Sequence, residues 1–98
     1  MNHPIHRVAG FEIVGEHALN VRFEDDTMRT IDFAPILGGE LLGPLNDLRV
    51  FRQVRVDPEA QTLVWPNGAD FDPAILYDWP QYAEEFAARA KAWQYAQT

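Results

Sequence analysis

The sequence predicts an α+β domain: a small antiparallel β-sheet, built as a meander plus a hairpin, with short connecting helices and an amphipathic C-terminal helix. Three observations predict it. Apolar and polar residues alternate through residues 6–33, which is the period of half-buried strands. Glycine and proline crowd residues 32–47, and apolar residues then recur at helical spacing over residues 80–97. A chain of 98 residues forms one domain, so we take 1–98 as a single unit.

The first third of the chain is predicted to form the meander. Its first strand lies in HRVAGFEIV, residues 6–14, with Gly10 as a candidate bulge. An acidic turn at residues 24–27 separates the second strand from the third. Five apolar residues of these two strands fall on one face: Leu19, Val21, Phe23, Ile31 and Phe33. We therefore expect the sheet to bury one face and leave the other in solvent.

The middle of the chain is predicted to be short and broken. Residues 32–47 hold too many breakers for a long element, so their apolar side chains should close one end of the core from single helical turns. Asn46 or Asp47 is expected to cap a short helix. Two strands, in residues 53–57 and 61–65, are then joined by a turn that opens with aspartate and proline.

The stretch WPNGADFDP, residues 65–73, is explained by turn and cap chemistry. Asn67 and Gly68 tolerate a positive φ, so the chain can reverse there. Asp72 is predicted to cap a short helix that begins at the next residue, a proline. Asp70 is expected to accept bonds from nearby backbone N–H groups. This interpretation gives every polar residue of the stretch a structural role.

The final segment has the clearest helical pattern. Asp78 is the expected N-cap, with Gln81 three residues later as in a capping box. An apolar stripe follows at helical spacing: Tyr82, Phe86, Ala90, Trp93 and Gln97. We expect the stripe to pack on the chain's own sheet, and the alternative is a homo-oligomer in which this helix forms the seam.

Composition excludes several classes of function. The chain has no cysteine and no serine, which excludes disulfides, thiolate metal sites and serine or cysteine nucleophiles. A net charge of −7 repels phosphate, so no direct nucleic-acid partner is expected. No apolar run is long enough for a membrane span, and the N-terminal residues do not resemble a secretory signal. We expect a cytoplasmic protein without a cofactor, a metal site or a membrane partner.

Three stretches carry a resemblance to a known family. FRQVRVDPEAQTLVWPNGADFDPAILYD, residues 51–78, resembles the signature of domain-of-unknown-function family 2442, which comprises small bacterial proteins. ALNVRFEDDTMRTIDFAPIL and PLNDLRVFRQV are similar to its other landmarks, and WPNGAD is the most specific part. The resemblance covers residues 6–79 and leaves the C-terminal helix, 80–97, outside it.

The resemblance implies a compact α+β domain without an established activity. Some members carry a helix-turn-helix after this domain, and others are encoded beside small toxin-like proteins, which implies antitoxin or regulatory roles. Because one helix follows the domain in this sequence, we do not expect an autonomous DNA-binding regulator.

We therefore expect a non-enzymatic protein-interaction module, antitoxin-like or regulatory, whose partner is a small basic protein. The expected surface is the 65–79 segment with the exposed side of the last helix, since interface energy concentrates on aromatic residues. The candidate residues are Trp65, Asn67, Asp70, Phe71, Asp72, Trp79 and Tyr95. Each aromatic side chain among them has the core as its alternative location. The alternative function is a small-ligand or metal-binding domain, or an enzyme, that uses Asn67, Asp70 and Asp72.

Overall fold

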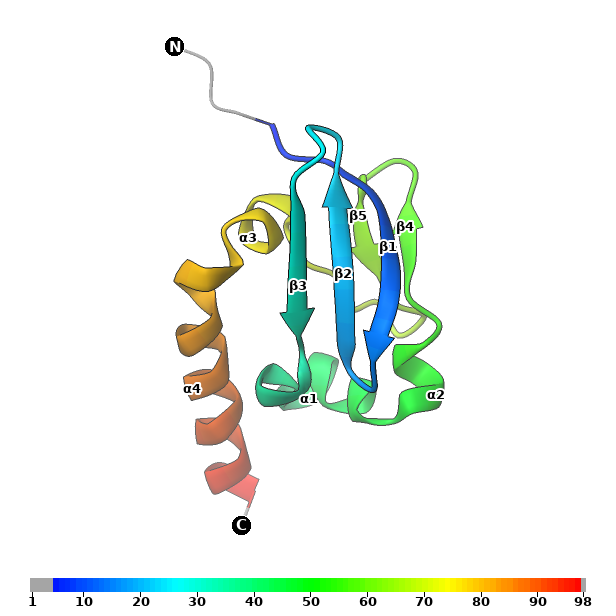
Figure 1. Cartoon of the computed structure of the whole chain (residues 1–98). Coiled ribbons are helices and arrows are strands. Elements are labelled where there is room, and N and C mark those ends of the chain that lie inside the picture. Colours follow the sequence, from blue (N-terminus) through cyan, green and yellow to red (C-terminus); the bar gives the residue numbers. More distant parts are fainter. Residues whose placement is uncertain (1–4, 98) are drawn as a thin grey trace.

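A computed structural model describes residues 5–97 and the side chains as far as Trp93, so the side chains of Tyr95 and Gln97 lie outside the described part. Within residues 5–97, five strands form two antiparallel sheets: β1 (Val8–Gly15), β2 (Ala18–Phe23) and β3 (Met28–Asp32), and separately β4 (Arg55–Asp57) and β5 (Thr62–Val64). The helical turns are η1 (Ala34–Ile36), α1 (Gly39–Leu42), η2 (Gly43–Asn46), α2 (Leu48–Phe51), α3 (Pro73–Tyr77) and α4 (Trp79–Gln97). The predicted α+β class, meander and hairpin are confirmed (Figure 1).

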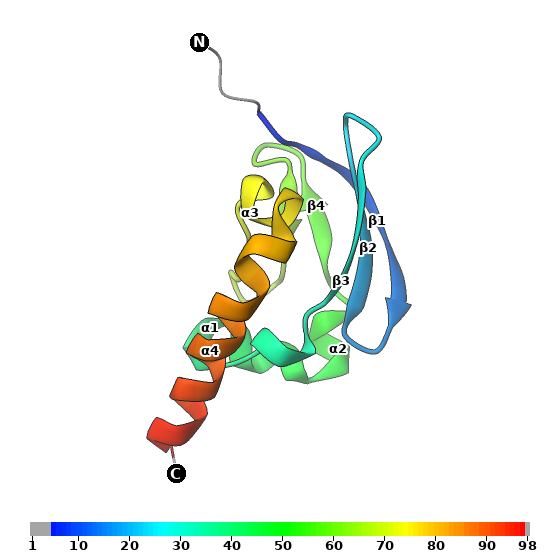
Figure 2. The same cartoon turned by 60° about the vertical axis from the view of Figure 1, so that its left-hand side comes forward.

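The meander buries one face, as the alternation predicts. Leu19, Val21, Phe23, Ile31 and Phe33 are all buried. The opposite face is open, and there Asn20 Nδ2 donates to Thr30 Oγ1 at 2.8 Å. The pairing of β1 with β2 shifts register between Val8 and Gly10, where the sequence predicts a bulge. Figure 2 shows the three-stranded sheet nearly edge-on, with the hairpin and helices on its buried side.

The two sheets are joined at the start of β1. The backbone N–H of Val8 donates to the carbonyl of Gln61, which lies in the turn between β4 and β5, at 2.9 Å. The core between the layers is strongly aromatic, with the fully buried Phe33 near its centre. Its ring centroid lies 5.4 to 6.0 Å from those of Phe51, Trp65, Phe71 and Trp79. Such tilted and edge-to-face pairs add to the stability that burial alone provides.

Helix α4 packs mainly on the other helical turns rather than on the strands, so the predicted partner of its stripe was wrong. Its neighbours are η1, α1 and α3. Trp79 stacks on Phe86 and reaches the core through Phe33 and Phe71. The sheet face that the stripe was expected to cover is instead filled by the hairpin and the aromatic core. No helix within residues 5–97 is both long and apolar enough to cross a membrane.

Candidate functional site

Three of the candidate aromatic residues belong to the core. Trp65, Phe71 and Trp79 are 3%, 5% and 7% exposed, so little of their side chains reaches solvent. The indole N–H of Trp65 donates to the carbonyl of Phe51 at 2.9 Å, which satisfies its one polar atom inside the core. The side chain of Tyr95 lies outside the described residues. The aromatic part of the predicted surface is therefore assigned to packing wherever the structure describes it.

Asn67 has a structural role on the surface. In the turn of residues 65–68 the N–H of Gly68 donates to the carbonyl of Trp65, and Gly68 takes a φ of 90°. Asn67 Oδ1 accepts from the N–H of Ala69 at 3.2 Å, and Asn67 Nδ2 donates to the carbonyl of Leu41 at 2.8 Å. The second bond ties the turn to α1, which lies far away in the sequence.

Asp70 and Asp72 differ although they are two residues apart. Asp72 caps α3, as predicted, because its Oδ1 accepts from the N–H of Ala74 at 2.8 Å. Asp70 is exposed, and its backbone forms an isolated bridge with Val64. The side-chain bond to the backbone that was predicted for Asp70 is made instead by Asn67. Asp70 is thus an exposed carboxylate with no structural bond among the described residues.

A groove of about 370 Å³ runs between α1 and the segment that leads through α3 to α4. Its apolar lining comprises Leu41, Leu42, Phe71, Ile75 and Phe86. Three exposed acidic residues also line it: Glu40, Asp70 and Asp72. We call this set of residues, together with Gly38 and Gly39, the acidic groove. It brings together three of the predicted site residues, Asp70, Phe71 and Asp72, with residues of the glycine-rich segment.

Two close contacts set the shape of the acidic groove. Asn67 holds α1 through the carbonyl of Leu41, as described above. Gly38 lies directly against α4, where a Cβ on Gly38 would come within 2.9 Å of the Cα of Ala90. Only glycine allows this approach of two backbones. The walls of the groove are therefore fixed by one side-chain hydrogen bond and one backbone contact.

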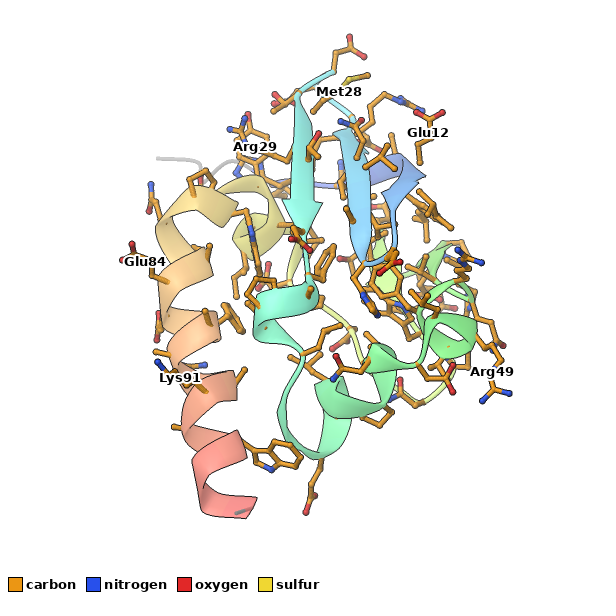
Figure 3. The ribbon with its side chains drawn as sticks, turned by 60° about the horizontal axis from the view of Figure 1, so that its bottom comes forward. Glu12, Met28, Arg29, Arg49, Glu84 and Lys91 are labelled. Carbon is orange, nitrogen blue, oxygen red and sulfur yellow. The ribbon has the colours of Figure 1, made fainter. Side chains whose placement is uncertain are left out.

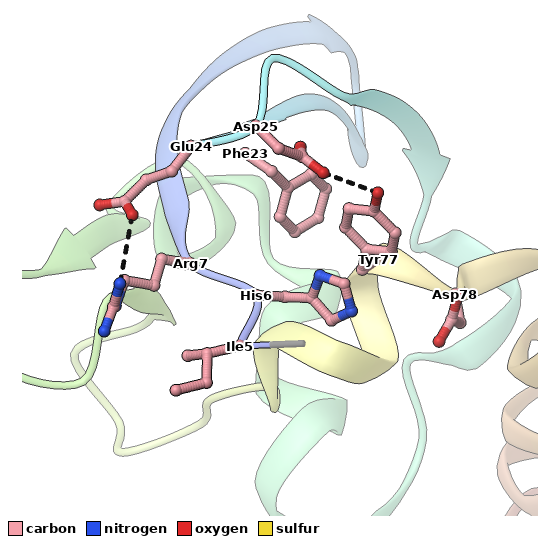
Figure 4. Close-up of a pocket in the computed structure, with 8 residues that line it drawn as sticks. All are labelled: Ile5, His6, Arg7, Phe23, Glu24, Asp25, Tyr77 and Asp78. Atoms are coloured by element: carbon pink, nitrogen blue, oxygen red, sulfur yellow. Dashed lines mark hydrogen bonds and ion pairs between the residues drawn. The ribbon is translucent and has the colours of Figure 1, made fainter. Parts of the chain in front are cut away.

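A second hollow, of about 590 Å³, lies near the N-terminal segment (Figure 4). The rings of His6 and Tyr77 stack with their centroids 3.7 Å apart, and the Tyr77 hydroxyl donates to Asp25 Oδ2 at 2.7 Å. Arg29 Nε donates to the carbonyl of Tyr77 at 2.8 Å. Hydrogen bonds from the Tyr77 hydroxyl, and then from Thr27, hold the pKa of Asp25 below its usual 3.8.

The contacts around Tyr77 fasten parts of the chain that are distant in sequence. They connect the segment before β1, the turn between β2 and β3, and the end of α3. Each polar atom of Tyr77 already has a partner, so the cluster is explained by its structural role. Within the described residues, no three histidine or acidic side chains gather in a way that could hold a metal ion. We therefore take the acidic groove as the candidate site.

Comparison with models of known protein families shows which family the chain belongs to. The model of the family described as Protein of unknown function (DUF2442) matches residues 8–82. The chain belongs to the DUF2442 family. The match contains β1 to β5, α3, and all groove residues except Phe86, which lies on α4 beyond its end. No curated protein and no solved structure matches the chain.

Sequence reasoning about this DUF2442 protein missed the α1 side of the groove. The glycine-rich segment predicts broken turns, but not which leucine turns outward, and Leu41 is 48% exposed whereas Leu37 and Leu45 are buried. It also missed His6, Asp25 and Tyr77 as a cluster, because Tyr77 lies 52 residues after Asp25 in the chain and still farther from His6. No local pattern in the sequence signals either arrangement.

Proposed function

We propose that this DUF2442 protein is a non-enzymatic interaction module that binds a small basic protein through the acidic groove. The groove itself carries the proposal, because it offers an apolar lining and an acidic margin in one place. Apolar contact provides most of the affinity at such sites, whereas charge complementarity selects the partner and speeds its association. An antitoxin-like or regulatory role is the setting that we propose for this binding.

The charges at the groove are available to a partner. Glu40 and Asp70 are exposed, and neither forms an ion pair among the described residues. The neighbouring cation Arg89 lies 5.5 Å from the ring centroid of Phe86 and is bonded to Glu85 at 2.6 Å. The charges of Arg89 and Glu85 offset each other, so Arg89 does not neutralise the acidic residues of the groove. A chain with a net charge of −7 adds a long-range field of the same sign.

The test compares the wild type with a double variant, Glu40→Gln with Asp70→Asn, which removes two groove charges without changing side-chain shape. The matched control, Glu12→Gln with Glu59→Gln, removes the same charge at exposed positions elsewhere. Tagged proteins capture partners from nuclease-treated lysate of the native host, and mass spectrometry identifies what is bound. We expect one small basic protein, recovered with the wild type and the control but strongly reduced with the groove variant. Equal recovery with all three proteins would contradict binding at the groove.

Salt separates the charge contribution from the apolar one. Because the groove charges are exposed, their interaction with a basic partner should weaken as ionic strength rises. The wild-type complex should therefore lose more affinity in high salt than the residual complex of the groove variant. A complex whose affinity is the same at low and high salt would contradict the electrostatic part of the proposal.

A further inference from the structure

We infer that the partner segment held in the acidic groove is an amphipathic basic helix that lies along α4. This inference rests on the proposed function and specifies the chemistry of what binds. The proposed occupant is a helix with apolar side chains on one face and lysine or arginine beside them. The evidence is the apolar and acidic lining of the groove together with the exposed Trp93 farther along α4.

A second apolar contact point lies about two helical turns past the groove along α4. Phe86, Ala90 and Trp93 follow i, i+4, i+7 spacing on α4, which places them on one face over about 10 Å. Ala90 is covered by its contact with Gly38, but Trp93 is 38% exposed. Both ribbon views show the C-terminal end of α4 extending beyond α1 (Figures 1 and 2). Two exposed apolar residues therefore mark this surface: Leu41 on α1 at the groove, and Trp93 on α4 beyond it.

A helix is the element that matches this surface. A bound helix that lies along α4 can place one apolar residue in the groove and another, seven positions later, against Trp93, and between them it crosses the contact of Gly38 with Ala90. The polar side of α4 faces away from this surface, as the labelled Glu84 and Lys91 show in Figure 3. The only charges that line the groove are acidic, at Glu40, Asp70 and Asp72, so the occupant needs basic residues next to its apolar ones.

A second copy of this chain fits the groove less well than a basic helix. Two copies would each bring a net charge of −7 and the same acidic margin to the interface. Like charges brought together in this way oppose association. The charge pattern therefore favours a foreign basic helix, and self-association becomes an outcome that the experiment must detect.

The test uses a phage-displayed library of random peptides of about 16 residues, roughly four helical turns, selected on the immobilised full chain. Synthetic peptides of the enriched sequences are then measured by fluorescence anisotropy and circular dichroism. We expect lysine and arginine enrichment, apolar residues at i and i+7, and a gain of helix on binding. Leu41→Ser and Trp93→Ala should each raise the dissociation constant about tenfold. Met28→Ser, at a more exposed apolar position on β3, should leave the dissociation constant unchanged.

The possible outcomes separate this inference from the proposed function. Basic peptides that lose binding with Leu41→Ser but gain no helix would overturn the helix and leave the proposed function standing. Three results would overturn both the helix and the proposed function: enriched peptides that are not basic, enriched peptides that bind Leu41→Ser as tightly as the wild type, or a selection that enriches no peptide. Sedimentation that shows a dimer, broken by Leu41→Ser and intact in Met28→Ser, would assign the surface to a second copy and overturn the inference.

Discussion

Replacing Gly38 by alanine tests how α4 is held against the rest of the domain. Gly38 has extended backbone angles, φ −138° and ψ 165°, which alanine adopts without strain. Any loss of stability in Gly38→Ala must therefore come from packing. A Cβ at this position would lie 2.9 Å from the Cα of Ala90 and 3.0 Å from its Cβ and carbonyl oxygen. Carbon atoms in good contact are about 3.5–4.0 Å apart, so α4 has to move.

The expected loss follows from that overlap. Forcing extra carbon into a close-packed contact costs about 1–3 kcal/mol, and here the obstructing atoms are largely helix backbone, which cannot turn aside as a side chain can. In a domain of this size, each kcal/mol lowers the melting temperature by about 4–8 °C. Because Gly38 also lines the acidic groove, the displaced helix should weaken partner binding as well.

Denaturant unfolding of Gly38→Ala is compared with that of Gly43→Ala. Gly43 has helical angles, φ −53° and ψ −44°, and an added Cβ there meets nothing within 4 Å. Alanine at Gly43 should therefore be neutral or stabilise the protein by about 0.4–1 kcal/mol. If the two variants unfold with equal free energy, or Gly38→Ala matches the wild type, the close contact between Gly38 and α4 is refuted.

Three further predictions concern single side chains. Asp72→Ala should lower the free energy of unfolding by about 1 kcal/mol through loss of the α3 cap, whereas Asp70→Ala should change it by less than about 0.5 kcal/mol. Chemical denaturation measures both variants, and equal losses would contradict the assignment of Asp72 as the cap. Asn67→Ala should lower the free energy of unfolding by about 1 kcal/mol because two hydrogen bonds are lost. Amide hydrogen exchange in α1 should become faster, and unchanged exchange there would refute the role of Asn67 in holding α1. Tyr77→Phe should raise the pKa of Asp25 toward 3.8, as measured by NMR titration. Because the pKa of Asp25 is lowered on folding, its ionised carboxylate stabilises the folded state above pH 3.8, and this stabilisation is lost as the pH falls through the folded pKa. The difference in unfolding free energy between wild type and Tyr77→Phe should therefore narrow below pH 3.8. A difference that stays constant with pH would contradict this account.

Local patterns predicted the features that depend on near neighbours. The faces of β2 and β3 follow from alternation, and burial of Leu19 and Ile31 confirms them. Asp47 and Asp72 cap α2 and α3 because each carboxylate reaches an N–H two residues later. The reversal at Gly68 likewise needs only the residues of one turn.

Prediction was less successful where two helices meet. Asp78 does precede α4, but its backbone angles are φ −98° and ψ 28°, because it also ends α3. An N-cap residue usually has extended backbone angles, and here the carbonyl of Asp78, instead of its carboxylate, accepts from the N–H of Gln81 at 2.9 Å. The direct succession of α3 and α4 thus replaced the predicted capping box.

The site could be predicted only in part. Within the segment of residues 65–79, Asp70 and Asp72 line one side of the acidic groove, and whether that side binds a partner stays a prediction. Its aromatic residues went to the core, because burial of Trp65, Phe71 and Trp79 depends on the whole packing arrangement. The other wall comes from α1, whose position is set by a bond from Asn67 to Leu41 across 26 residues, which no periodic pattern reports.

The measurement that tests the acidic groove most directly is chemical-shift mapping of the ¹⁵N-labelled chain with the basic protein that it captures. We predict that the largest shifts fall on residues 40–42 and 70–75 and on α4 around Phe86. The same titration of the Glu40→Gln, Asp70→Asn double variant should need far more partner to produce them. Shifts confined to the open face of the sheet, around Gly10, Glu12 and Met28, would contradict the account.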